Sequence, residues 1–467
     1  MRKIWIALSL FLLSACTVGP DYVRPTAPAP ARWTVAYQAA ADLANAEWWR
    51  QFGDPVLDNL IETAVRENLD LKVAAARVDQ FLGALDTTRS QYFPQISAAY
   101  TGIRQRQAEM PNESHQATVN ASWELDLWGR IRRANEASQA QIVGSEAGRR
   151  GVLLTLTANV ASGYLTLRGL DRQLEVTRAT EKAYAESLKL FRLRFEYGTV
   201  SQLEVAQAES QYEAARQSIP AYESLIRQQE NLIQLLLGRP PGPIPRGKGL
   251  DELTAPGIPA GLPSELLERR PDILQAEQAL IAANAQIGVA KAAYFPRISL
   301  TGALGVASAD IGRLVAPGTD IWSAGGQIAA PLFSFGGLSG QVKQAEAQEQ
   351  QALFLYRQSI LTGFREVEDA LVKATKGREQ LEAQERQVRA LEEYARLSRL
   401  QFEAGTSSYL QVLDADRSLF SGRLAFNQTR FDLLTAIVSV YKSMGGGWVA
   451  EAEKLGPPGT SWPANYQ

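Results

Sequence analysis

The sequence predicts an α+β membrane protein made of two copies of one unit, each with a β-hairpin followed by a very long coiled-coil helical hairpin. Three observations predict this class. The segment YFPQIS at residues 92–97 returns as YFPRIS at residues 294–299, which indicates an internal duplication. Stretches of alternating apolar and polar residues follow both segments, and a sustained seven-residue apolar period comes after each of them.

The N-terminus predicts export and a lipid anchor. Arg2 and Lys3 precede an apolar run of about ten residues, which is typical of a secretory signal peptide over residues 1–15 and too short for a membrane span. The sequence LSAC that ends at Cys16 resembles a bacterial lipobox, in which the signal is removed before a cysteine that then carries lipid. We therefore expect lipid on Cys16; a plain signal peptide with a chance cysteine is the alternative. Residues 16–53 would then form a lipidated, extended N-terminal segment.

The first repeat is expected over residues 54–238, with a helix, a β-hairpin at 95–127 and a helical hairpin at 130–238. Strict alternation over residues 119–127 predicts a strand with one apolar and one polar face. A helix from residue 130 to 197 would be about 100 Å long at 1.5 Å per residue. Its seven-residue apolar period predicts a left-handed supercoil. The period is carried by Leu153, Val160, Leu167, Leu174, Leu188 and Phe195, and only Glu181 is out of the pattern.

The second repeat is expected over residues 262–445, with a helix, a β-hairpin at 297–331 and a helical hairpin at 338–445. A proline- and glycine-rich connector at 239–261 separates the repeats, and a tail at 446–467 follows them. The apolar period of its long helix is carried by Ile360, Val367, Ala374, Leu381, Val388, Ala395 and Phe402. Gly198 and Gly405 are expected to end the two long helices in the left-handed conformation.

The expected strands are long enough to cross a bilayer when tilted, since about ten residues suffice. Four strands in one chain cannot close a membrane barrel, because the smallest known barrels have about eight strands and an open edge in lipid leaves backbone groups unpaired. The protein is therefore expected to oligomerise; a soluble four-stranded sheet is the alternative. His115 falls between two expected strands and is interpreted as an exterior loop residue.

Composition excludes several other functions. The net charge of −2 gives no basic field for nucleic acid. Cys16 is the one cysteine, which excludes a disulfide framework. His115 is the one histidine, which excludes His-rich metal sites and nearly every catalytic Ser/His or Cys/His pair. The acids Asp414 and Asp416 lack the convergent partners of a metal or acid/base site. We expect no enzyme activity, no metal and no cofactor other than covalent lipid on Cys16.

Several motifs then resemble the TolC-like outer-membrane efflux proteins, in their lipoprotein OprM branch. The motifs are Trp48-Trp49 with Phe52, Asp54-Pro55 and Leu57, then Arg269-Arg270-Pro271-Asp272-Ile273 with Ala276-Glu277, Tyr294-Phe295-Pro296, Tyr441-Lys442, and Gly445-Gly446-Gly447-Trp448. The resemblance implies a homotrimer with a twelve-stranded barrel in the outer membrane, continuous with a twelve-helix barrel in the periplasm of a Gram-negative cell. The termini and the connector would form an equatorial region. The implied function is the exit duct of a tripartite efflux system for drugs or other small molecules, with a periplasmic adaptor and an inner-membrane pump, most simply of the resistance-nodulation-division (RND) type.

The resemblance also implies two sets of functional residues. Adaptor docking is implied for the turns of the helical hairpins, at Tyr197, Gly198, Thr199, Val200 and Ser201, and at Gly405, Thr406, Ser407 and Ser408. A channel constriction is implied at Leu410 and Asp414, whose i, i+4 spacing places them on one helix face. Arg417, three residues beyond Asp414, is positioned to neutralise it; an ordinary solvated helix face is the alternative. The counterparts in the first repeat are Leu203, Gln207 and Ser210.

Other functions remain open at this stage. The same channel could serve a different transporter or a type I-like secretion system, because a tunnel by itself gives little selectivity. A coiled-coil scaffold lipoprotein would need the helices but not the alternating strands. An exported enzyme would need a catalytic constellation, and the sequence shows none.

Overall fold

The computed structural model describes residues 17–26, 30, 33–34, 47–107, 110–257 and 266–446. The predicted signal peptide at residues 1–15, the predicted lipidation site Cys16 and the tail beyond residue 446 lie outside the described residues. The chain divides into two compact units. The first comprises Met1–Pro28, Ala74–Arg149 and Asp272–Ile360, and the second comprises Ala29–Val73, Arg150–Pro271 and Leu361–Gln467.

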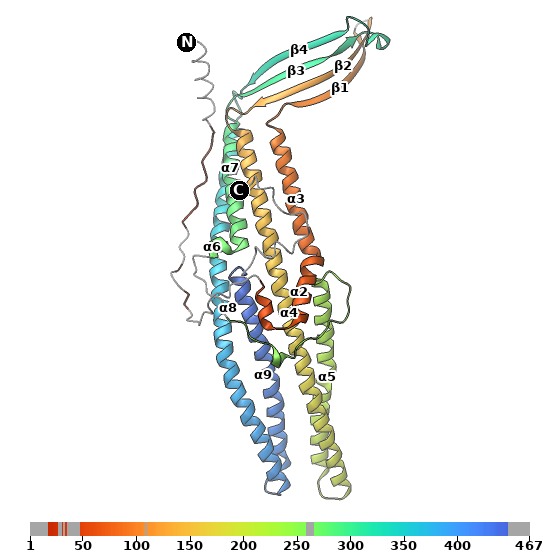
Figure 1. The fold of residues 1–467 in the computed structure, drawn as a ribbon, viewed down its shortest axis with the longest axis vertical. Coiled ribbons are helices and arrows are strands. Elements are labelled where there is room, and N and C mark those ends of the chain that lie inside the picture. Colours follow the sequence, from red (N-terminus) through yellow and green to blue (C-terminus); the bar gives the residue numbers. More distant parts are fainter. Residues whose placement is uncertain are drawn as a thin grey trace. The chain divides into compact units, whose positions relative to one another are not determined.

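Equivalent helices of the two repeats have equal lengths (Figure 1). The helix before each β-hairpin has 22 residues, the first helix of each helical hairpin has 67, and the returning helix has 35. The pairs are α3 (Leu69–Ser90) and α7 (Pro271–Ala292), α4 (Arg130–Glu196) and α8 (Gly337–Glu403), and α5 (Gln202–Leu236) and α9 (Tyr409–Ser443). Despite their length, none of the described helices has the apolar run that a membrane span requires. The equal lengths confirm the predicted internal duplication.

The first unit contains an antiparallel sheet with the order β1-β2-β3-β4. Its strands are β1 (Gln95–Gln107), β2 (Met110–Leu125), β3 (Arg297–Ser308) and β4 (Asp320–Ala329). One row of paired residues across the sheet is Ala98, Val119, Leu304 and Trp322, and the adjacent row is Ser97, Asn120, Ala303 and Ser323. Because neighbouring residues of a strand point to opposite faces, the first row lies on an apolar face and the second on a polar face. In these two rows, the alternation predicted from the sequence therefore continues across all four strands.

The two β-hairpins differ in their turns, and the first of them shows that one prediction, the loop position of His115, is wrong. β2 begins at Met110, shortly after the end of β1, whereas the connection from β3 to β4 contains the short helix η5 (Ile311–Arg313). His115 lies inside β2, opposite Gly102, so its interpretation as a loop residue is wrong. A hydrogen bond of 2.8 Å joins its Nδ1 to the hydroxyl of Tyr100. β2 extends back to Met110 because its polar first half pairs with β1 although it lacks the apolar alternation that marks residues 119–127. Gly102 leaves room for the contact between His115 and Tyr100, since a Cβ there would crowd both side chains.

The core of the second unit surrounds the N-terminal part of the first repeat. The short helix η2 (Trp48–Phe52) and α2 (Pro55–Glu67) pack with α4, α8 and α9. Trp48 stacks on Tyr441 with their ring centroids 5.1 Å apart. The buried Asp54 caps α2 by accepting from the Val56 amide at 2.9 Å, and it also accepts from the Tyr164 hydroxyl at 2.8 Å. Motif residues that carry the family resemblance thus have a structural role in this core.

In each repeat, a side-chain hydrogen bond connects the C-terminal end of the returning helix to the residue that precedes α3 or α7. In the first repeat, Asn68 Nδ2 donates to Leu236 O at 2.8 Å; in the second, Arg270 Nη1 donates to Ser443 O at 2.9 Å. Each bond satisfies a carbonyl that the last helical turn leaves without an intrahelical partner. Arg270 is buried, and its Nη2 also lies 2.7 Å from Glu366 on α8. The second hairpin is therefore held by an ion pair that the neutral Asn68 cannot make.

Candidate functional site at the ends of the helical hairpins

Each helical hairpin ends in a turn that a glycine defines. Gly198 has φ +71° and Gly405 has φ +72°, a left-handed conformation that costs other residues about 1 kcal/mol or more. The following amides close both turns in the same way, since Thr199 N donates to Arg194 O and Thr406 N donates to Gln401 O, each at 2.9 Å. A Cβ at either glycine would have no atom within 4 Å. Both turns therefore leave room for a contacting protein.

The two turns are capped differently. Ser201 N donates to Glu204 Oε2 at 2.7 Å, which forms a capping box at the start of α5. Ser408, at the start of α9, makes no side-chain capping bond. Tyr197 exposes 77% of its surface in the first turn, and the equivalent residue of the second turn is Ala404. The nine predicted docking residues thus lie in two turns of similar backbone but different side chains.

An aromatic cluster joins the two hairpins next to these turns. Phe191 of α4 contacts Tyr409 of α9 and Phe402 of α8, with ring centroids 4.0 Å and 6.0 Å away. Leu188 and Val412 complete its buried centre together with Ala208 of α5. Burial raises the pKa of Tyr409 above its ordinary value. Sequence reasoning missed this cluster because Phe191 lies outside the seven-residue series.

The three predicted constriction residues lie together on the wall of one groove. Leu410, Asp414 and Arg417 of α9 line a groove of about 630 Å³, opposite Gln207 and Ser210 of α5. Leu410 is 63% exposed, and Asp414 and Arg417 are not buried either. The structure therefore brings the predicted constriction residues beside Gln207 and Ser210, two of their three counterparts in the first hairpin.

The partner of Asp414 differs from the one considered from the sequence. Among the described residues, no ion pair joins Asp414 to Arg417. Instead the hydroxyl of Tyr394, on α8, donates to Asp414 Oδ2 at 3.2 Å. Burial and this carboxylate both raise the pKa of Tyr394. Asp414 is thus tied to the other helix of its own hairpin by a neutral donor.

Asp416 has the environment that Asp414 lacks. Its side chain is 12% exposed and lies 2.7 Å from Arg399 Nη2 on α8. Burial raises the pKa of the Asp416 carboxyl above its ordinary value, and the Arg399 guanidinium offsets only part of this effect. In the described part of the chain, no group of three His, Cys, Asp or Glu side chains is arranged to hold a metal ion. Asp416 therefore has a structural role, since its ion pair with Arg399 joins α9 to α8.

The raised pKa of Asp416 predicts a pH dependence. Because the pKa is higher in the folded protein than in the unfolded chain, the contribution of Asp416 to stability is present in acid and is lost as the pH rises through that pKa. We expect the difference in melting temperature, parent minus Asp416→Asn, to be more positive at about pH 4.5 than at about pH 7. Thermal melts of both proteins at the two pH values check this, and an equal difference at both would contradict it.

The sheet with one apolar face and the helical hairpins with closely matched turns define a class of protein, a membrane channel subunit with a long helical extension. Two stretches of the chain, residues 60–239 and 262–446, match the family model described as outer membrane efflux protein. The chain belongs to this family. The family is one of transport proteins, which is the kind of function that the sequence predicts.

Relatives agree with this assignment over nearly the whole chain. Toluene efflux pump outer membrane protein TtgC of Pseudomonas putida is 39% identical over 459 residues, which are 95% of each chain. Cation efflux system protein CusC of Escherichia coli is 33% identical over 446 residues, 93% of this chain and 96% of that protein. The open-state crystal structure of the Neisseria gonorrhoeae MtrE outer membrane channel is 30% identical, with a TM-score of 0.84 over 92% of this chain and 98% of that chain. The predicted TolC-like efflux channel, its fold class and its outer-membrane location are confirmed.

Proposed function

We propose that three copies of this chain assemble into the exit duct of a tripartite efflux pump. Each copy would contribute four strands to a twelve-stranded barrel and two helical hairpins to a twelve-helix tunnel. Drugs or other small molecules would enter from an inner-membrane pump of the RND type and leave across the outer membrane. Lipid on Cys16 would add a second attachment to the membrane, since each buried methylene of an acyl chain contributes about 0.8 kcal/mol.

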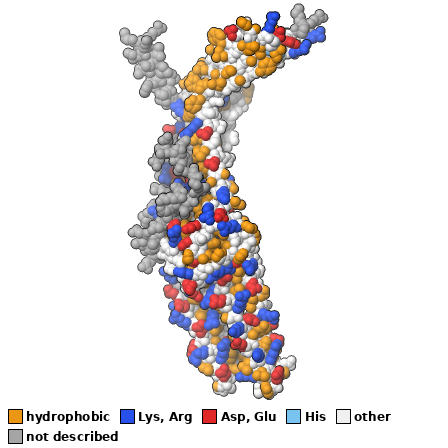
Figure 2. Space-filling view, turned by 45° about the vertical axis from the view of Figure 1, so that its right-hand side comes forward, with side chains coloured by type: hydrophobic (Ala, Val, Ile, Leu, Met, Phe, Trp, Pro, Cys, Tyr) orange, Lys and Arg blue, Asp and Glu red, His pale blue; other side chains and the backbone are white. Residues whose placement is uncertain are grey.

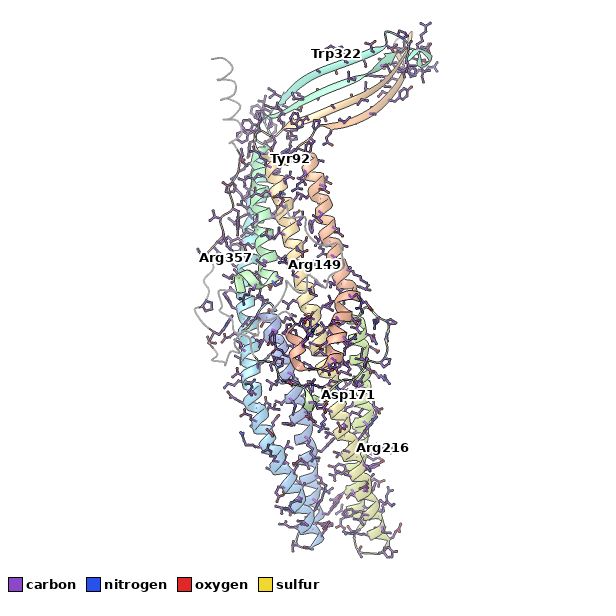
Figure 3. All side chains as sticks on the ribbon, viewed as in Figure 1. Tyr92, Arg149, Asp171, Arg216, Trp322 and Arg357 are labelled. Carbon is purple, nitrogen blue, oxygen red and sulfur yellow. The ribbon has the colours of Figure 1, made fainter. Side chains whose placement is uncertain are left out.

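The apolar face of the four-stranded sheet is the observation that carries this proposal. Val119, Leu304 and Trp322 of that face are 51%, 68% and 76% exposed on the single chain. Figure 2 shows hydrophobic side chains gathered over the strands, and Figure 3 labels Trp322 on β4. Among the described residues, β1 and β4 each pair with one strand only. An apolar face of this kind is stable in contact with lipid, and the open edges of β1 and β4 need partner strands. Further copies of the chain are the simplest source of those strands.

The groove residues of α9 are proposed to form the closed end of the tunnel. In a threefold assembly, Leu410 would repeat as an apolar ring that excludes water, and Asp414 as an acidic ring that favours cations. The equivalent positions of the first hairpin carry Leu203 and Gln207, so only the second hairpin would supply charge to the ring. Arg417 lies one turn further along the same helix and would contribute to the potential of the constriction.

The hairpin turns are proposed to dock the periplasmic adaptor. They are the ends of both hairpins, and a Cβ at either glycine would meet no atom within 4 Å. Two turns per copy would give six contact points in a trimer, alternating between the capped first turn and the uncapped second turn. Relatives are named as outer membrane proteins of efflux pumps, which supports a partner at this end.

Purification in mild detergent followed by reconstitution tests the proposal. We expect a particle with the mass of three mature chains, which gives discrete single-channel conductance steps in planar bilayers. A cell that lacks the gene should become more susceptible to pump substrates, and the gene should restore resistance. A monomer without conductance would contradict the proposal and would favour a scaffold.

A further inference from the structure

The connector between the repeats contacts both helical hairpins. Four of these contacts are with side chains of α4 or α5 in the first hairpin, namely Tyr164, Arg168, Asp171 and Glu230. Tyr164 Oη accepts from Gly247 N at 2.9 Å, and Arg168 Nε donates to Lys248 O at 2.9 Å. Arg246 pairs with Asp171 at 2.9 Å and with Glu230 at 2.6 Å. Asp171 is labelled on α4 in Figure 3. The connector is therefore firmly attached to the first hairpin.

Asp251, in the short helix η3 (Leu250–Glu252), extends this attachment to the second hairpin. Its Oδ2 lies 3.2 Å from Arg172 Nη2 of α4, and its Oδ1 lies 3.2 Å from Arg430 Nη1 of α9. Arg430 Nη2 also donates to the backbone carbonyl of Asp251 at 3.0 Å. One carboxylate thus joins two arginines that belong to different hairpins. Arg172 also pairs with Glu175 of its own helix at 2.8 Å, so Asp251 is the acid that Arg172 and Arg430 share.

The Asp251 bridge lies where the two hairpins approach closely. A Cβ at Gly169 of α4 would overlap the ring of Phe431 on α9, so the helices depend on this glycine to meet there. Gln173 Nε2 of α4 donates to Gln428 Oε1 of α9 at 3.2 Å, one turn further along. Nearer the turns, the same helices border grooves of about 550 Å³ and 630 Å³. The close contact therefore sets the distance between α4 and α9, the helix that carries Leu410 and Asp414 nearer the turn.

We propose that Asp251 is an equatorial latch that holds the second hairpin against the first and so favours the closed constriction. The proposal rests on the proposed function, because it assumes that the constriction lies at Leu410 and Asp414. Separation of α9 from α4 at this contact would pull Arg430 away from Asp251, because the connector stays attached to α4 and α5. The latch would make the closed state depend on a charge about five helical turns from the constriction.

Conductance of reconstituted channels tests the latch. Asp251→Asn and Arg430→Gln should each raise the resting conductance about two- to fivefold over the parent at about 0.1 M salt, the range expected for a partly exposed ion pair. The double variant should not exceed Asp251→Asn appreciably, since that variant already removes the ion pair with Arg430. The ratio to the parent should fall towards one at about 1 M salt, where exposed charges are screened. General loosening of the fold would produce neither the coupling nor the salt dependence.

A matched control is the neighbouring acid of the same connector. Glu252 accepts from Gly249 N at 2.8 Å within the connector itself, so Glu252→Gln should leave the conductance unchanged. Trimer melting measured on every variant shows whether assembly is preserved. The latch is overturned if Asp251→Asn matches the parent, or if the effects of Asp251→Asn and Arg430→Gln multiply. If the Leu410→Ala, Asp414→Ala variant also matches the parent, the constriction itself is misplaced and the latch falls with it.

Discussion

The double substitution Leu410→Ala and Asp414→Ala raises the resting conductance of the reconstituted channel by about tenfold or more. Leu410 is largely exposed on the single chain, so a ring of three such side chains is the apolar element that the substitution removes. Replacing each leucine by alanine removes three carbons from a water-excluding ring, and a loss of about 1.4 kcal/mol from the barrier to ion passage is enough for a tenfold change. Single-channel recording measures the conductance, and susceptibility to large antibiotics such as vancomycin measures permeation in cells.

The single variant Asp414→Ala tests the effect of the acidic ring separately from that of the leucine ring. Since Asp414 bonds to Tyr394 and forms no ion pair with Arg417 in the described structure, its removal should lower cation selectivity while opening the channel little. The matched control is Leu203→Ala with Gln207→Ala, which changes the equivalent positions of the first hairpin and should affect conductance far less. Conductance and antibiotic entry equal to those of the parent in the Leu410/Asp414 double variant would place the constriction elsewhere along α9.

The elements of this fold are predictable because local patterns determine them. The alternation at residues 119–127 needs no knowledge of neighbouring strands, and the seven-residue period of α4 and α8 depends on the sequence of each helix alone. Glycine at 198 and 405 marks the turns because few other residues adopt a positive φ without cost. The repeated segments then place each predicted element twice, and the described helices and strands follow that order.

Partners across elements are less predictable. Phe195 and Phe402 occupy equivalent positions of the period, yet Phe402 packs against Phe191 and Tyr409 whereas Phe195 is 45% exposed. The sequence treats the two as equals, because nothing in either helix shows how one hairpin packs on the other. The duplication predicts a pseudo-symmetric chain, and the packing between its halves removes that symmetry.

Asp414 shows the same limit at the candidate site. Helical spacing correctly places Asp414, Leu410 and Arg417 on the wall of one groove. It suggests Arg417 as the partner because that residue is near in sequence, whereas the observed donor is Tyr394, on the preceding helix of the hairpin. The connector contacts of Asp251 are equally hidden, because they join residues that are far apart in the chain. Spacing determines which side chains share a face, but only packing determines what they meet.

A large charged side chain at a hairpin turn should abolish efflux while leaving the channel assembled. In Gly405→Glu or Gly198→Glu the new side chain points into open space, because no atom lies within 4 Å of a Cβ at either position. The left-handed backbone costs about 1 kcal/mol for a non-glycine residue, which is small for a trimer with long helical contacts. The reason to expect a large effect is therefore loss of the docking contact: drug resistance should fall to the level of a strain without the channel, and the adaptor should no longer copurify.

The matched controls are Gly405→Asn and Gly198→Asn. Asparagine tolerates the left-handed conformation better than other residues and adds no charge, so these variants isolate the cost of the backbone. We expect them to retain most of the resistance, with trimer melting close to that of the glutamate variants. Normal resistance in both glutamate variants would refute docking at the turns. Equal loss in the asparagine variants would instead attribute the defect to the turn conformation, because the charge would then be irrelevant to the contact.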